Sequence, residues 1–199
     1  MRVWQRMLSG RRLDLMNPSP MDIEIDDIAH GLSRVARWNG QTNGDHGFSV
    51  AQHSVLVAQI AQKIQPRAPQ SWFLAAMLDD ASQYVSGDLV APFKSMLGVD
   101  YHEFEARLMR AVCVRFGLPA ILSPEMKKFI KRADKIAAYL EATQLAGFSE
   151  AEGRDLFGAP PLQVRDWVIK PVPANQSKAE YLRMFYDLAE QADADTAVA

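Results

Sequence analysis

The sequence contains a single cysteine, only four histidines and no apolar run that approaches the ~18 residues of a membrane span. One cysteine excludes an internal disulfide and is in keeping with a reducing compartment. We interpret Cys113, which stands in an apolar segment, as a buried small hydrophobe rather than a nucleophile. No secretion segment follows Arg11-Arg12, so we expect a cytoplasmic protein that does not enter a membrane.

An excess of positive charge is also missing. The chain has 22 Lys and Arg residues against 24 Asp and Glu residues, which gives a formal net charge of −2. The basic residues that do cluster, between positions 127 and 135, have the spacing of one helix face. This balance does not indicate non-specific nucleic-acid binding, and we expect no nucleic-acid partner.

Alternating strand patterns are absent as well, whereas signals for helix starts recur. Capping-box spacing begins at Ser49, Ser149 and Ser177, and Ser123 is followed by a proline, which is favoured in the first helical turn. The sequence therefore predicts an all-α bundle of about six or seven helices. We expect these helices over residues 25–37, 50–64, 71–83, 100–116, 124–146, 150–157 and 177–191.

The length of 199 residues and the 48% hydrophobic content are typical of one domain with a sizeable core. We expect its core over about 26–146, with 147–199 forming C-terminal helices and an arm packed on that core. Prolines near 159–175 predict an extended arm that lies over the bundle, because proline disfavours helix. We expect the polar C-terminal tail to fray.

One imidazole and three carboxylates could hold a divalent cation if helices bring them together. These are His53, near the start of one predicted helix, Asp79 and Asp80 near the end of the next, and Asp134 within a later one. Each has a simpler alternative. His53 could be a hydrogen-bonded buried histidine, Asp80 a helix-end residue, and Asp134 an ion-pair partner of Lys131 or Arg132. The sequence leaves both interpretations open.

Five short motifs follow one another along the chain. In order they are Arg37-Trp38, Ser49-Val-Ala-Gln-His53-Ser54, Leu78-Asp79-Asp80-Ala81-Ser82-Gln83, Gly87-Asp88 with Pro92-Phe-Lys94, and Ala133-Asp134-Lys135. From about Asp26 to about Glu141 the chain resembles the 5′-deoxynucleotidase-like branch of the HD superfamily of metal-dependent phosphohydrolases. The resemblance implies an HD-domain helical bundle.

The resemblance also implies roles for particular residues. It makes His53, Asp79, Asp80 and Asp134 metal ligands, and it places Gln83 where the family has a glutamate that transfers protons. In the substrate pocket it implies a phosphate clamp at Arg37, a sugar-facing wall at Trp38, a contact to the sugar 3′-hydroxyl at Asp88, and a further substrate contact at Lys94.

Two of these positions depart from the family pattern. Asp79 replaces the histidine of the His-Asp pair, and carboxylates shift the site toward the oxygen-rich ligand set that Mg²⁺ or Mn²⁺ prefers. Glutamine at position 83 cannot transfer a proton, a loss that typically costs ~10²–10⁴-fold in rate. Asp79 or Asp88 would have to take that role, and Asp79 is the better candidate. We expect one weakly held divalent ion, Mn, Mg or Co.

The sequence leaves two functions open. The first is a phosphohydrolase that acts on a nucleotide, with a (deoxy)nucleoside 5′-monophosphate as the preferred substrate. The second is a catalytically degenerate HD domain that binds a nucleotide or a protein partner without turnover. A deliberately inactivated variant is disfavoured, because residues 79–83 depart from the family at three places, Asp79, Ser82 and Gln83. Related proteins often form homodimers, and residues 108–116 are a candidate surface.

Overall fold

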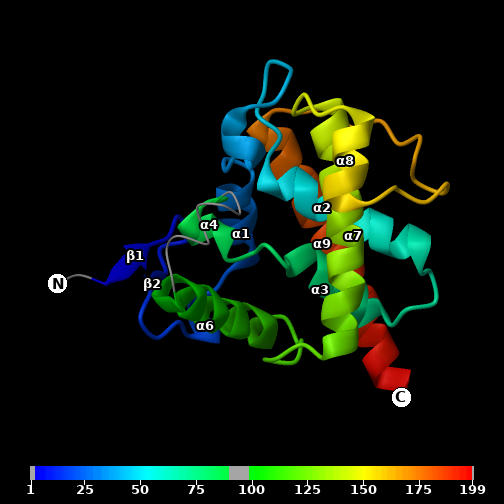
Figure 1. Cartoon of the computed structure of the whole chain (residues 1–199). Helices are drawn as coiled ribbons and strands as arrows, with labels where there is room; N and C mark the ends of the chain where they lie inside the picture. The colour runs from blue at the N-terminus through cyan, green and yellow to red at the C-terminus, as the bar shows by residue number, and fades with distance from the viewer. Residues whose placement is uncertain (1–2, 90–98, 199) are drawn as a thin grey trace.

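The computed structural model describes residues 3–89 and 99–198, of which the side chains of 99–100 and 196–198 are not described. Its architecture is an all-α bundle with one small antiparallel hairpin (Figure 1), which confirms the predicted fold class. The helices are α1 (Ile25–Leu32), α2 (Val50–Ile64), α3 (Gln70–Leu78), α4 (Gln83–Ser86), α6 (Val99–Arg115), α7 (Pro124–Gln144), α8 (Glu150–Phe157) and α9 (Ala174–Val198), with 3-10 turns at Pro20–Asp22 and Arg37–Gly40.

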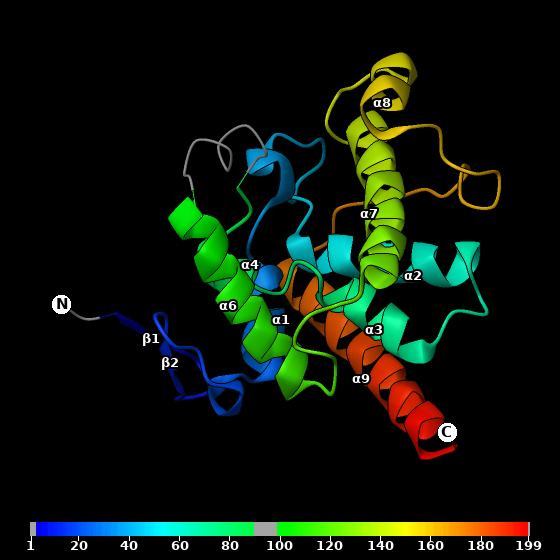
Figure 2. The same cartoon turned by 60° about the horizontal axis from the view of Figure 1, so that its bottom comes forward.

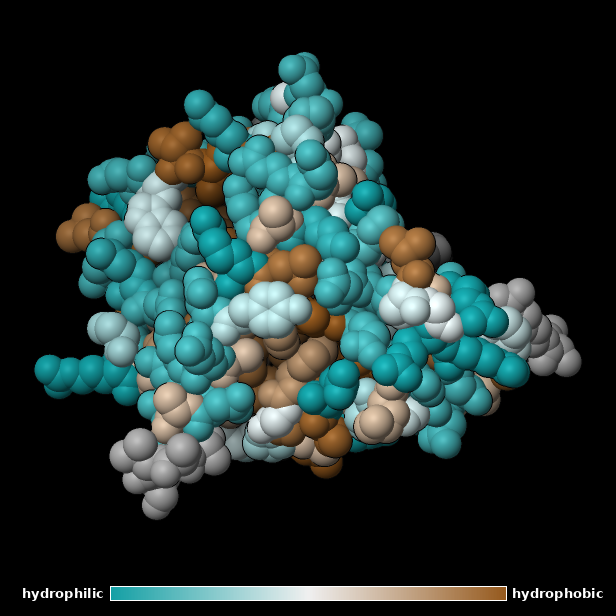
Figure 3. Space-filling model, turned by 180° about the vertical axis from the view of Figure 1, so that it is seen from behind, coloured by the Kyte–Doolittle hydropathy of each residue, from teal (hydrophilic) through white to brown (hydrophobic). Residues whose placement is uncertain are grey.

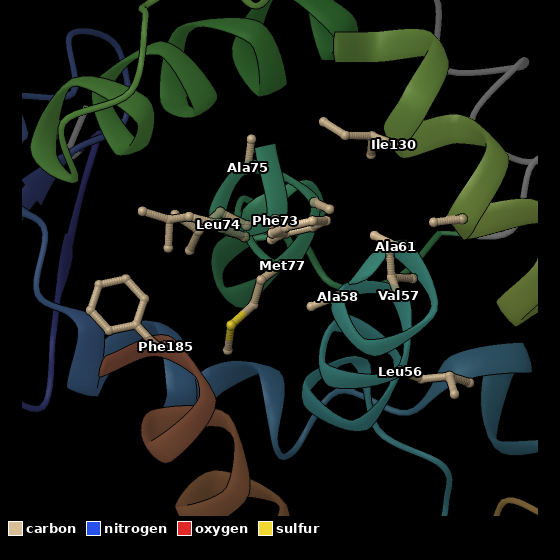
Figure 4. Packing of buried hydrophobic residues seen from close by; sticks show 14 of the residues in the cluster. Leu56, Val57, Ala58, Ala61, Phe73, Leu74, Ala75, Met77, Ile130 and Phe185 are labelled. Carbon is tan, nitrogen blue, oxygen red and sulfur yellow. The ribbon is translucent and has the colours of Figure 1, made fainter. Parts of the chain in front are cut away.

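Helix α3 lies in the middle of the bundle, in contact with α2, α7 and α9. Its last six residues are all buried, so the helix is apolar on every side, as expected of one that other helices surround. Figure 4 shows Phe73, Leu74 and Met77 of α3 between Val57 of α2 and Phe185 of α9. Figure 2 shows α9 crossing beneath α3, so the C-terminal helix closes the core from one side.

The helix starts follow the predicted caps in three cases and fail in one. The side chains of Ser49, Ser123 and Ser149 accept hydrogen bonds from the first turns of α2, α7 and α8, and Ser149 forms a complete capping box with Glu152. The prediction for Ser177 is wrong. Helix α9 begins three residues earlier, and the Ser177 hydroxyl donates to a carbonyl within the helix.

Three helix ends also differ from the sequence prediction. Helix α1 ends at Leu32 rather than 37, and α3 ends at Leu78 rather than 83, because the chain turns at both places to present side chains to one site. The helix that contains the polar tail, α9, extends to Val198 rather than ending at 191. Its inward-facing Tyr181, Phe185 and Leu188 anchor the helix against the core.

Two segments outside the helices complete the fold. The hairpin of β1 (Trp4–Arg6) and β2 (Arg12–Asp14) is not predicted from sequence, since three-residue strands are too short to alternate visibly. The proline-rich segment 158–173 is an irregular arm, as predicted, although it forms no strand among the described residues. Gln52 and Gln144 hold the arm by hydrogen bonds to its backbone.

The cysteine and the candidate dimer surface can now be placed. Cys113 is buried, as predicted, and burial raises the pKa of its thiol to about 11. Its neighbours Leu108 and Val112 are also buried within the protein, so most of the apolar face of 108–116 forms core and is not a free surface. In the part of the chain that the structure describes, no helix is both long and apolar enough to cross a membrane.

Candidate functional site

Three of the four predicted metal ligands come together around the ring of His53. His53 stands in the first turn of α2, where Ser49 caps the helix, and its side chain is only 3% exposed. Its Nε2 atom lies 3.3 Å from Oδ2 of Asp80 and 3.4 Å from Oδ1 of Asp134. Because Asp80 follows α3 and Asp134 belongs to α7, the set depends on the packing of three elements. Asp134 also pairs with Lys131, at 2.5 Å, so the simpler interpretation of this residue holds as well.

The turn that joins α3 to α4 carries the residues that depart from the family pattern. Gln83 is buried, and its Nε2 donates to Oδ1 of Asp80 at 2.6 Å. The other end of the amide, Oε1, has no hydrogen-bond partner among the described residues. Asp79 is exposed and, within the same described part of the chain, joins none of the hydrogen bonds that connect His53, Asp80 and Asp134. Its roles as metal ligand and proton carrier stay predictions.

A fully buried glutamate that the sequence motifs do not include links His53 to Arg37 and Trp38. Glu141 lies two helical turns after Asp134 on α7, a spacing that puts both on one face. Its Oε1 is 2.5 Å from Nδ1 of His53, and its Oε2 accepts from Nε of Arg37 at 3.2 Å and from Nε1 of Trp38 at 2.9 Å. The signal that could have revealed it is a lone charge within the apolar run 136–142.

Arg37 and Trp38 reach the site through an unusual backbone turn. Residues 36 and 49 form an isolated antiparallel bridge, which fixes this segment beside the start of α2. Trp38 and Asn39 then adopt left-handed φ values of 57° and 51°, a conformation that costs ~1–3 kcal/mol and clusters at functional sites. The indole packs against Phe148 and Phe157, at centroid distances of 5.7 and 6.2 Å.

Arg37 is already engaged by two carboxylates. Its NH2 atom lies 3.1 Å from Oε2 of Glu141, and its NH1 atom lies 3.4 Å from Oδ2 of Asp88. Asp88 is thereby placed at the site, although its predicted contacts with a sugar and with a proton stay predictions. Lys94 lies outside the described residues. The site therefore gathers residues from the five motifs, with Lys94 still to be placed.

The charges of the cluster shift its pKa values in opposite directions. Burial and Arg37 work against protonation of His53, yet Glu141 and the two aspartates outweigh them and raise the pKa of that imidazole well above its ordinary value. Burial and the charges of Asp80 and Asp134 raise the pKa of Asp79 to about 7. Because solvent still reaches Asp79, repulsion by its two neighbours is the cause that its position best supports.

The donor set suits a divalent cation, although it is not arranged around one. Among residues 3–89 and 99–198, no group of three or more His, Cys, Asp or Glu side chains is already set as a metal site. Two ligands at bonds of about 2.1 Å lie about 3.0–3.4 Å apart around an ion, close to the distances that separate Nε2 of His53 from Asp80 and Asp134. The carboxylate on Nδ1 is the usual partner of a metal-binding histidine. The residues therefore fit a cation after small reorientations.

A separate open cavity of about 700 Å³ lies between α2 and the arm. Its lining includes Leu56, Trp167 and Ile169 but none of the residues that surround His53. On the face seen from behind, the surface is largely hydrophilic, with apolar side chains gathered near its middle (Figure 3). The chemistry-bearing residues and this cavity are thus separate features.

No family model matches the sequence. Two relatives cover nearly its whole length. The uncharacterized protein RCAP_rcc00048 of Rhodobacter capsulatus is 54% identical over 181 residues, which are 90% of this chain and 92% of the relative. The uncharacterized protein YfdR of Escherichia coli K12 is 30% identical over 185 residues, which are 93% of this chain and 95% of that protein. The chain belongs to the family that these two proteins represent.

Proposed function

We propose that the protein is a cytoplasmic, divalent-metal-dependent phosphohydrolase of the HD type that acts on a nucleotide. The preferred substrate class is (deoxy)nucleoside 5′-monophosphates, from which inorganic phosphate is released. The observation that carries this proposal is the environment of His53. Its Nε2 faces Asp80 and Asp134 at 3.3 and 3.4 Å, while its Nδ1 is held by the buried Glu141.

His53, Asp80 and Asp134 are the residues that would hold the cation. A divalent metal ion supplies Lewis-acid chemistry, which polarises a phosphoryl oxygen and activates water as a nucleophile. Gln83 keeps Oδ1 of Asp80 occupied, so that Oδ2 is the oxygen presented to His53. In this proposal, side chains from three elements would hold the cation at one place.

Arg37 supports a phosphate site with part of its guanidinium. Its Nε and NH2 atoms are taken by Glu141, whereas its NH1 atom makes a long contact, 3.4 Å, with Asp88. A phosphate oxygen near NH1 would form a charge-assisted hydrogen bond. Glu141 aligns the planar group for this contact, and lysine could not reproduce that fork of donors.

A second candidate function is nucleotide binding without turnover, and Gln83 favours it. The amide stands where the family resemblance implies a proton-transferring glutamate, and it is bonded to Asp80 instead. Asp79 is an exposed carboxylate beside the cluster, so turnover depends on whether it can serve in place of that glutamate.

The test is phosphate release from dAMP by protein supplied with Mn²⁺ or Co²⁺. We expect slow hydrolysis that a chelator abolishes, and we expect Asp134→Asn to abolish it as well. Asp155→Asn is the matched control, because Asp155 is exposed on α8 outside the site. Release that persists in Asp134→Asn or with chelator would contradict the proposal. Metal-dependent binding of dAMP without any release would favour the second candidate.

A further inference from the structure

Glu141 divides its two carboxylate oxygens between the two parts of the site. Oε1 faces Nδ1 of His53 at 2.5 Å, on the side of the candidate metal ligands. Oε2 faces Arg37 and Trp38, with distances of 3.1 Å to NH2 of the arginine and 2.9 Å to Nε1 of the indole. The side chain is 0% exposed, so it reaches neither solvent nor a substrate. Its influence must pass through these three residues.

We propose that Glu141 is a positioning residue, which fixes the ring of His53 so that Nε2 is its metal donor and, with its other oxygen, sets Arg37 and Trp38 in the substrate pocket. The inference rests on the metal site of the proposed function. An ionised carboxylate is acceptor-only, so the atom that faces it on His53 must carry hydrogen. When a cation takes the place of the hydrogen that Nε2 directs toward Asp80 and Asp134, Nδ1 keeps its hydrogen and the lone pair of the imidazole lies on Nε2.

A glutamine in the same place cannot satisfy both sides. All the contacts to Glu141 come from N–H groups, whereas a glutamine offers them one carbonyl oxygen and one NH₂ group. If the carbonyl stays with Arg37 and Trp38, the NH₂ group faces Nδ1 of His53, which must then accept. The ring hydrogen moves to Nε2, and the metal donor is lost. Glu141→Gln therefore reverses the tautomer while it keeps the shape of the side chain.

Aspartate tests the converse. Glu141→Asp keeps the charge and the acceptor-only chemistry but is one methylene shorter, so it should retain the tautomer and recover part of the metal affinity. Glu24→Gln is the matched control, because Glu24 also accepts from two arginines, Arg11 and Arg115, on a part-exposed surface outside the site. The three variants separate charge, reach and the general effect of removing the charge from a carboxylate that pairs with arginine.

The experiment measures Zn²⁺ affinity by calorimetry and the protonation of the His53 ring nitrogens by ¹⁵N NMR in the full chain. We expect Glu141→Gln to weaken Zn²⁺ binding ~10–100-fold, the range for losing a carboxylate partner of a ligating histidine. We expect Glu141→Asp to fall between this variant and the parent, and Glu24→Gln to match the parent. In the parent with Zn²⁺, Nδ1 should carry the hydrogen and Nε2 should be the coordinated nitrogen.

Unchanged Zn²⁺ affinity in folded Glu141→Gln would overturn the role of Glu141. So would coordination through Nδ1 in the parent, a result that needs no variant to fold. Phosphate release plays no part in these measurements, so a protein that binds Zn²⁺ as expected but hydrolyses nothing would contradict the proposed function and leave this inference standing. A parent that binds no divalent metal would overturn both, because Glu141 would then have no ligand to position.

Discussion

The two halves of the site are built on different principles. In the half formed by α2 and α7, His53, Asp134 and Glu141 are joined in a chain of hydrogen bonds and ion pairs that leaves no end of Glu141 unused. In the half formed by the turn after α3, Asp79 is exposed, and Gln83 has a buried oxygen with no partner among the described residues. The first half uses all of its hydrogen-bonding atoms around Glu141, whereas the second contains an exposed carboxylate and a buried amide oxygen without a described partner.

This difference predicts that substitutions in the two halves have different effects on stability. A buried carboxylate that several donors contact is expensive to remove, because its partners lose their acceptor at once. An exposed carboxylate and a half-bonded amide cost little to change. We therefore expect substitutions at Asp79 and Gln83, the positions that depart from the resemblance, to cost less stability than substitution of Glu141.

The largest effect should come from truncating Glu141. Glu141→Ala leaves the buried His53 and the partly buried Arg37 and Trp38 with donors that lack this acceptor. We expect the free energy of unfolding to fall by about 3–5 kcal/mol, the range for removing one partner of a buried ion pair. Urea unfolding measures it, with Glu24→Ala as the control expected to cost at most ~1 kcal/mol. Equal losses for both would show that the α2 and α7 half is not specially bound into the fold.

The next effect concerns activity and the half formed by the turn after α3. Asp79→His with Gln83→Glu restores the ligand and the proton-transfer group that the family resemblance implies. We expect phosphate release from deoxynucleoside 5′-monophosphates with Mn²⁺ to rise at least ~10²-fold, the lower range for gaining a general acid or base. Neither change alone should suffice, because the two groups act as a unit. A folded double variant with the activity of the parent would mean that the difference between the halves is not what limits turnover.

Much of this comparison could be predicted from the sequence, because its signals are local. Ser49 and Ser123 mark the starts of α2 and α7, and the ordered motifs predict that His53, Asp80 and Asp134 meet. The turn at Trp38 could not be predicted, since its left-handed backbone is held by tertiary contacts to Glu141 and to two phenylalanines. A buried charge within an apolar helix face reveals its partners only when the helices are packed.

The buried Glu141 also changes the effect that we expect from replacing Arg37. As a pure phosphate clamp, Arg37 could be replaced by lysine with little effect on stability. The structure shows two contacts to the buried Glu141, which a lysine cannot both reproduce. We therefore expect Arg37→Lys to lower the free energy of unfolding as well as any binding of phosphate.

The smallest effect should follow from Gln83→Met, which tests directly how little the fold depends on the turn after α3. The substitution removes the hydrogen bond from Nε2 to Asp80, and bonds to charged groups contribute about 1.5–3 kcal/mol. It also removes the buried Oε1, which has no partner among the described residues and whose burial costs about 1–3 kcal/mol. These contributions oppose each other, so we expect urea unfolding to show a net change within about 1 kcal/mol.

Gln52→Met is the control, because both ends of Gln52 bond to the arm, at Lys170 and Val172. We expect Gln52→Met to lower the free energy of unfolding by more than Gln83→Met does. If Gln83→Met were the more destabilising of the two, the fold would depend on the turn after α3 more than on these contacts with the arm, which would contradict the prediction.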